Sequence, residues 1–112
     1  MKKLILLLFI ACAQELPVIE TVEKETFQQL MQNNYPLLDV RTPQEFQSGH
    51  IENALNINFN APDFTDKISA LDKEQPFLIY CAVGGRSTRA ATLMKSLGFK
   101  KVYELKGGYN NW

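Results

Sequence analysis

The chain is poor in metal-ligating and disulfide-forming residues, with two cysteines and one histidine among 112 residues. So few of these residues do not supply the four ligands of a structural zinc site. An excess of basic residues is also missing, because twelve Lys and Arg residues balance twelve Asp and Glu residues. A balanced charge gives no electrostatic support for binding nucleic acid. Because 46% of the residues are apolar, the chain is too hydrophobic for a disordered protein, and we expect one globular domain without a metal.

The first apolar run, residues 4–13, is too short to cross a membrane as a helix, which needs about 20 apolar residues. Lys2 and Lys3 precede it and small residues end it, a pattern typical of a secretory signal peptide. An uncleaved hydrophobic first element is the alternative. We expect a signal peptide over 1–13 and an exported domain over 14–112.

Two cleavage points fit this segment. Cutting after Ala13 follows the small-x-small rule of ordinary signal peptidase, whereas cutting before Cys12 follows a bacterial lipobox and attaches a lipid to its sulfur. Phe9 stands where a lipobox usually has Leu, which weakens the second reading. Either cut leaves Cys81 as the only free thiol. We expect a protein that is periplasmic or anchored by lipid to the cell envelope.

Hydrophobic periodicity divides the remaining chain into alternating strands and helices. Thr42 and Glu45 have capping-box spacing around Pro43, which indicates a helix start. Alternation of the two element types predicts an α/β fold with a mainly parallel sheet. The expected elements are a linker at 15–20, helices at 23–32, 42–48, 63–71 and 87–97, strands at 37–40, 54–57, 77–80 and 101–105, and a final turn at 107–112.

The most informative stretch is the loop Cys81-Ala82-Val83-Gly84-Gly85-Arg86-Ser87, which joins an apolar strand to the best helix. Sites in parallel sheets form beyond the carboxyl ends of the strands, which is where Cys81 stands. Small residues and glycines allow successive backbone N–H groups to turn inward around an anion. These groups, the helix N-terminus and Arg86 favour the thiolate, which is the nucleophilic form of Cys81. The loop therefore predicts a reactive cysteine rather than a small buried hydrophobe.

Loop length separates two chemistries that use such a cysteine. Phosphatases of this kind place five residues between cysteine and arginine to ring a phosphate, whereas four residues separate Cys81 from Arg86. The smaller ring suits a second sulfur carried on the cysteine, which is a persulfide. This hypothesis requires a Cys81 thiol that reacts near neutral pH and is open to solvent.

Motifs outside the loop follow one another over residues 18–112. They are Leu38-Asp39-Val40-Arg41, Glu45-Phe46, Gly49-His50-Ile51 with Ala54, Leu97-Gly98-Phe99, Val102-Tyr103, and Gly107-Gly108 with Trp112. Together with Tyr80 and the Cys81 loop they resemble the rhodanese family of sulfurtransferases in its single-domain form. The resemblance implies a central parallel sheet with helices on both faces. It also implies that Cys81 takes a sulfane sulfur from a donor such as thiosulfate and passes it to cyanide or a thiol.

Several side-chain roles can be assigned physically. Backbone N–H groups of residues 82–86 would stabilise the thiolate and the persulfide, as an oxyanion hole stabilises oxygen. The Arg86 side chain either orients an anionic donor or pins the loop, and both roles stay open. Ser87 caps the helix, which we favour, or donates to the loop. We expect His50 to pack at a helix end rather than to pair with Cys81.

Asp39 and Arg41 follow a buried strand at the same edge of the sheet. Their side chains either steer the donor or form a structural ion pair, for example Arg41 with Glu45, and we favour the structural role. Tyr109 and Trp112 are expected to pack on the core.

Two other hypotheses compete with the enzyme. The first is a non-catalytic module that carries sulfur or binds a protein; the intact Cys81 and Arg86 argue against a module that only binds a protein, but they do not exclude a sulfur carrier. The second is a small phosphatase or an arsenate reductase, and the short loop argues against both. The lack of a second usable cysteine also argues against a reductase that cycles between redox states. The apolar Ala82 and Val83 leave the donor open between thiosulfate and a persulfide or thiol. We expect no cofactor, partners limited to small sulfur anions and thiols, a monomer, and membrane attachment only through a lipid on Cys12.

Overall fold

Five short strands form one sheet in the order β1-β5-β4-β2-β3, and every neighbouring pair is parallel. The computed structural model describes residues 16–112, so the predicted signal peptide and Cys12 lie outside the described part. Within it, no helix is long and apolar enough to cross a membrane. The strands are β1 (Ile19–Val22), β2 (Leu37–Asp39), β3 (Leu55–Asn56), β4 (Phe77–Tyr80) and β5 (Val102–Leu105). The helices are α1 (Lys24–Met31), α2 (Pro43–Ser48), α3 (Phe64–Ser69) and α4 (Gly85–Ser96).

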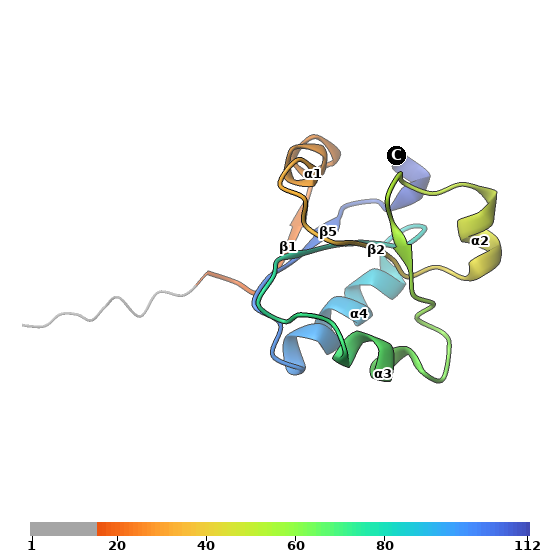
Figure 1. Cartoon of the computed structure of the whole chain (residues 1–112). Coiled ribbons are helices and arrows are strands. Elements are labelled where there is room, and N and C mark those ends of the chain that lie inside the picture. Colours follow the sequence, from red (N-terminus) through yellow and green to blue (C-terminus); the bar gives the residue numbers. More distant parts are fainter. Residues whose placement is uncertain (1–15) are drawn as a thin grey trace, which may run out of the picture.

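Helices cover both faces of this sheet, as predicted. Figure 1 shows α1 on one face and α3 with α4 on the other. The core is divided in the same way, because successive residues of a strand point to opposite faces. Leu78 and Tyr80 pack with Phe27 of α1, whereas Phe77 and Ile79 pack on the face that α3 and α4 cover. Burial on both faces favours apolar residues, which explains the run Phe77-Leu78-Ile79-Tyr80 in β4.

The prediction of a linker at residues 15–20 is wrong in its C-terminal part. Residues 19–22 form β1, which pairs in register with residues 102–105. This strand is short and lies at the edge of the sheet, and its two middle residues are exposed. The β-branched residues Val18, Ile19 and Thr21 are the signal for it, and Glu20 interrupts the apolar pattern.

The capping box at the start of α2 is confirmed. The Glu45 backbone N–H donates to Thr42 Oγ1 at 3.2 Å, and the Thr42 backbone N–H donates to Glu45 Oε1 at 3.0 Å. Pro43 occupies the first helical turn, where the absence of its N–H costs no hydrogen bond. This reciprocal cap fixes the Glu45 carboxylate at the N-terminus of α2.

Candidate active site

The Cys81 loop lies at the carboxyl end of β4, directly before α4. Gly84 has φ +131°, a conformation that residues with a side chain rarely adopt. This conformation brings the Gly84 backbone N–H to 3.0 Å from Cys81 Sγ, to which it donates. The Ser87 hydroxyl oxygen lies 3.4 Å from the same sulfur. The predicted cradle of donors around the sulfur therefore has a geometric basis in this structure.

The pKa of Cys81 lies below its ordinary value, although two opposing effects act on it. Burial is the largest effect and raises the pKa, because it removes water from the charged form. The Ser87 hydroxyl, when it donates, and the backbone N–H groups of Ser87, Gly84 and Val83 lower it. The hydrogen-bond donors together outweigh burial, so the loop favours the thiolate.

The expectation that the thiol is open to solvent is wrong for this structure, because Cys81 is only 1% exposed. Cys81 packs in the core on the face of the sheet that α3 and α4 cover. Val83, at the outer part of the loop, is 66% exposed. The loop has to shift before a sulfur donor can touch Sγ, since a sulfur atom needs direct contact to react.

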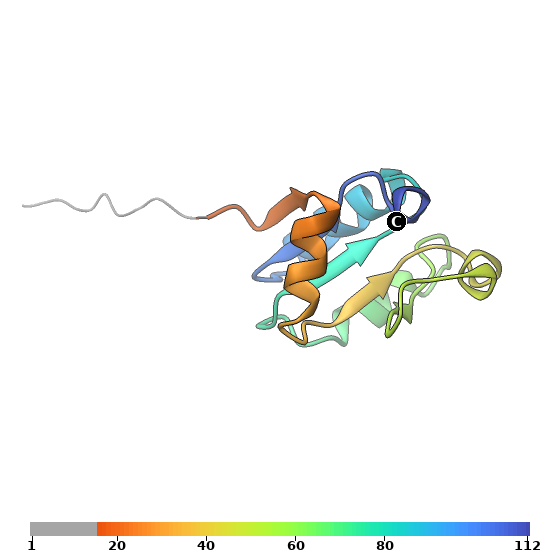
Figure 2. The same ribbon diagram turned by 90° about the horizontal axis from the view of Figure 1, so that it is seen from above.

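The C-terminal turn supports the loop from outside. The Tyr109 backbone N–H donates to the Cys81 carbonyl at 2.8 Å, and the Asn110 N–H donates to the Ala82 carbonyl at 3.0 Å. In a planar trans peptide the C=O and the following N–H point in opposite directions. Fixing these two carbonyls against the turn therefore aims the N–H groups of Ala82 and Val83 away from it. In Figure 2 the chain's C-terminus lies beyond the heads of the central strands.

Gly108 makes this close approach geometrically possible. It has φ +64°, and a Cβ at this position would lie 2.5 Å from the Ala82 carbonyl oxygen and 2.6 Å from the Cys81 carbonyl oxygen. Real Cβ atoms do not approach backbone that closely. Any larger residue at position 108 has to push the turn away from the loop.

The Arg86 side chain is held by helix α2. Its two terminal nitrogens donate to the two carboxylate oxygens of Glu45 at 2.7 and 3.0 Å. A bidentate pair of this kind has a defined geometry. This contact is the one expected if Arg86 pins the loop; whether Arg86 also orients a donor stays a prediction.

Sequence comparison places this arrangement among known proteins. The chain matches the rhodanese-like domain over residues 23–112. It belongs to that family. It is 35% identical over 94 residues to the thiosulfate sulfurtransferase GlpE of Pseudomonas aeruginosa, and the aligned region covers 83% of each protein. It is 32% identical over 104 residues to the mitochondrial protein High Arsenic Content 1 of Arabidopsis thaliana, covering 84% of this chain but 62% of that relative.

A solved structure has the same fold. The rhodanese-related protein of Thermoplasma volcanium superposes with a TM-score of 0.74 at 27% identity, covering 83% of this chain and 89% of that one. The rhodanese-like α/β fold predicted from the sequence is therefore confirmed.

Arg41 forms a structural ion pair in this rhodanese-like domain, which is the role that the sequence favours. Its partner is Asp39, so the prediction that Arg41 pairs with Glu45 is wrong. Arg41 donates to both carboxylate oxygens of Asp39, with the shortest contact at 2.7 Å, and both residues are buried. It also donates to the Gly49 carbonyl at 2.7 Å. Its guanidinium lies 4.5 Å from the ring centre of Tyr109, so this pair supports the turn beside the loop.

The expected packing roles of the remaining aromatic residues are confirmed. His50 stacks on Phe46 with the planes 9° apart, and its Nδ1 lies 2.8 Å from the Phe46 carbonyl. Trp112 packs edge-on against Phe27, with ring centres 6.1 Å apart. Tyr109 packs beside Tyr80 in the core that α1 covers. No Cys–His pair forms among the described residues.

The preferred prediction for Ser87, a helix cap, is wrong. Helix α4 begins at Gly85, two residues earlier than predicted, and its N-cap Gly84 makes no side-chain cap. Ser87 is instead buried inside the first turn, where its hydroxyl donates to Glu104 Oε2 at 2.5 Å. The sequence predictions include no role for Glu104. The one signal for it is a single acidic residue within the apolar strand β5.

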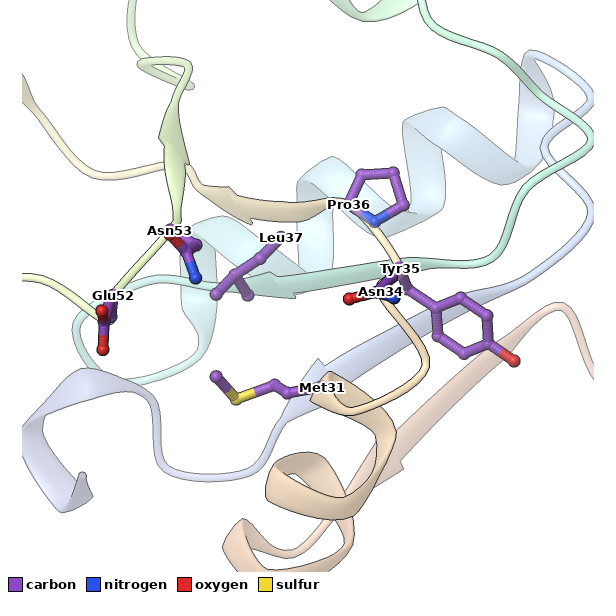
Figure 3. Close-up of a pocket in the computed structure, with 7 residues that line it drawn as sticks. All are labelled: Met31, Asn34, Tyr35, Pro36, Leu37, Glu52 and Asn53. Carbon is purple, nitrogen blue, oxygen red and sulfur yellow. The ribbon is translucent and has the colours of Figure 1, made fainter.

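A cavity of about 260 Å³ lies away from this chemistry. Figure 3 shows it between the end of α1, where Met31 points into it, and the start of β2 at Leu37. Glu52 and Asn53, which precede β3, complete its lining. These residues stand at the amino ends of β2 and β3, whereas Cys81 follows the carboxyl end of β4. Because the strands are parallel, the cavity and Cys81 lie at opposite ends of the strands.

Proposed function

We propose that this protein is a sulfurtransferase that carries a sulfane sulfur on Cys81. The observation that carries the proposal is the contact within the six-residue loop that Cys81 begins, in which the Gly84 N–H donates to the Cys81 sulfur at 3.0 Å. Resemblance to a relative named thiosulfate sulfurtransferase supports the same reaction class. Cys81 is the proposed nucleophile, and residues 82–86 are the proposed binding loop.

The proposed reaction is a double displacement. The Cys81 thiolate attacks the outer sulfur of thiosulfate, the S–S bond breaks, and sulfite leaves with the bonding electron pair. Cyanide then attacks the outer sulfur of the Cys81 persulfide. Thiocyanate forms, and Sγ leaves as the regenerated thiolate. A thiol acceptor or a persulfide donor would follow the same two steps, with no cofactor needed to balance them.

Backbone rather than side-chain charge is proposed to bind the donor. Arg86 is already paired with Glu45, and the side chains of Ala82 and Val83 carry no charge. The N–H groups of the loop remain to stabilise the anionic donor and the persulfide, in the manner of an oxyanion hole. This arrangement leaves the donor open between thiosulfate and a persulfide.

The test is the turnover of thiosulfate and cyanide to thiocyanate by the purified full chain. We expect turnover by the unmodified protein and none by Cys81→Ser. The matched control is Cys12→Ser, which removes the other cysteine and is expected to keep the wild-type rate. Equal rates for the unmodified protein and Cys81→Ser would contradict the proposal.

A second candidate is a non-catalytic module that carries sulfur or binds a protein. The 1% exposure of Cys81 favours it, because a covered thiol meets substrates slowly. A carrier would hold a persulfide without turning over, whereas a binding module would hold none. Turnover that depends on Cys81 would exclude both.

Export is a separate proposal about residues 1–13. When the full chain is expressed in bacteria, we expect it in the periplasm or attached to the cell envelope. Labelling with palmitate that is lost in Cys12→Ala would establish lipid attachment, whereas a shortened protein without label would indicate cleavage after Ala13.

A further inference from the structure

Glu104 is a buried carboxylate two hydrogen bonds away from the Cys81 sulfur. It lies in β5 and is 4% exposed. Three hydroxyl groups surround it: Ser87 at 2.5 Å and Thr88 at 2.8 Å from Oε2, and Thr21 at 3.3 Å from Oε1. Among residues 16–112 it forms no ion pair. Thr88 Oγ1 also lies 2.6 Å from the Gly84 carbonyl oxygen, to which its one proton can go, so the shortest contact with the carboxylate is that of Ser87.

Ser87 stands between this carboxylate and the sulfur, and its hydroxyl has one proton to donate. Its oxygen lies 2.5 Å from Glu104 Oε2 but 3.4 Å from Cys81 Sγ. A hydrogen bond to a carboxylate oxygen at 2.5 Å is stronger than one to a sulfur atom, which is a weak acceptor. The Ser87 proton therefore goes to Glu104, and a lone pair of Ser87 Oγ faces the sulfur. That lone pair accepts from an S–H group but gives nothing to a thiolate.

We propose that Glu104 is a positioning residue that fixes the direction of the Ser87 hydroxyl and so withholds the Ser87 proton from the Cys81 thiolate. Only the backbone N–H groups then favour the thiolate. When residue 104 no longer accepts this proton, the Ser87 hydroxyl can donate to Sγ. This inference deepens the proposed function, since formation of the thiolate is the first step of sulfur transfer.

Other charged groups around Glu104 are already paired or belong to the loop. From α4, Arg86 pairs with Glu45 and Arg89 lies over the ring of Phe59. From β1, Glu20 pairs with Lys101. On β4, the register neighbour of Glu104 is the apolar Ile79. Cys81 is thus the titratable group that the hydrogen bonds link to Glu104.

The test is the pH profile of Cys81 alkylation by iodoacetamide in the variant Glu104→Gln. This change keeps the shape of the side chain and removes its charge, and the Gln amide can donate to Ser87. Losing a nearby negative charge and gaining a donor both favour the thiolate. We expect the apparent pKa to fall by about one unit, with alkylation several-fold faster at neutral pH. An unchanged or raised apparent pKa would overturn the proposal.

Two further variants keep the test decisive. Glu20→Gln removes one negative charge from the neighbouring strand without a contact to the loop, and its profile should match wild type. Ser87→Ala removes the acceptor of the S–H group, so the apparent pKa should fall; a rise would mean that Ser87 donates to the thiolate and would refute the proposal. Alkylation needs no sulfur transfer, so this result is independent of whether the protein turns over thiosulfate.

Discussion

Arg86, the last residue of the six-residue loop, gives both terminal nitrogens to the carboxylate of Glu45, at 2.7 and 3.0 Å. The same carboxylate closes the capping box of α2 through Thr42. One side chain thus joins the start of α2 to the loop that carries Cys81. The guanidinium of Arg86 is therefore held in place beside the loop by Glu45.

The first prediction concerns the coupling of Arg86 and Glu45. Arg86→Ala and Glu45→Ala should each lower stability and sulfur transfer, because each frees the same end of the loop. The double variant should lose less than the two single losses combined, with a coupling of about 1 kcal/mol in urea unfolding. Strict additivity would show that the pair does not pin the loop.

The second prediction follows from the pKa of Glu45, which is lowered to about 2, mainly by the hydrogen bonds from Arg86. A carboxyl group whose pKa is lower in the folded state than in the unfolded state stabilises the folded state. For Glu45 this stabilisation is fully present at a pH above 4.5, the ordinary pKa of the group, and is lost as the pH falls towards 2. The stability difference between wild type and Glu45→Gln should therefore be full at neutral pH and shrink in acid. The measurement is urea unfolding of both proteins over this range. A difference that grows in acid would have the wrong sign.

The third prediction concerns Gly108. Gly108→Ala should destabilise the protein by about 2 to 3 kcal/mol, because the new Cβ meets the Cys81 and Ala82 carbonyls. It should also slow sulfur transfer, since the turn that orients the loop peptides must move. The matched control is Gly85→Ala in thermal unfolding. Gly85 lies in α4 with open space around a Cβ, so Ala there should keep or raise stability. Equal losses at both positions would contradict the steric account.

The fourth prediction concerns the 1% exposure of Cys81. Because the loop must shift to admit a reagent, alkylation of the folded protein should depend strongly on reagent size. N-ethylmaleimide should react faster than a maleimide attached to a large polymer, and the ratio of these two rates should be larger for the folded protein than for the unfolded chain. Each rate is followed by loss of the free thiol in the Cys12→Ser variant, in which Cys81 is the one remaining cysteine. Identical ratios in the two states would mean that the sulfur is open in solution.

The fold could be predicted from the sequence where periodicity and turn residues agree. The apolar run of β4 and the capping box at Thr42 and Glu45 each have a local cause, so both were predictable. Strand β1 was missed because an edge strand buries little and its pattern is interrupted by Glu20. Its partner β5 lies about eighty residues away in the chain, which no local pattern reveals.

The site was predictable only in part, for the same reason. Cys81, the glycines and Arg86 are adjacent in the chain, so the loop and its chemistry follow from spacing. The Arg86–Glu45 pair and the Ser87–Glu104 contact join separate elements, and they exist only once α2 and β5 are packed beside the loop. The burial of Cys81 also depends on this packing, which is why an open thiol was expected from the sequence.

The most direct test of the account is the mass of the protein after incubation with thiosulfate and removal of the excess donor. We predict a gain of about 32 Da located on Cys81, from one added sulfur atom, and its complete loss on addition of cyanide. The Cys12→Ser variant should gain the same mass. An unmodified Cys81 under these conditions, or an added sulfur that cyanide does not remove, would contradict the central claim.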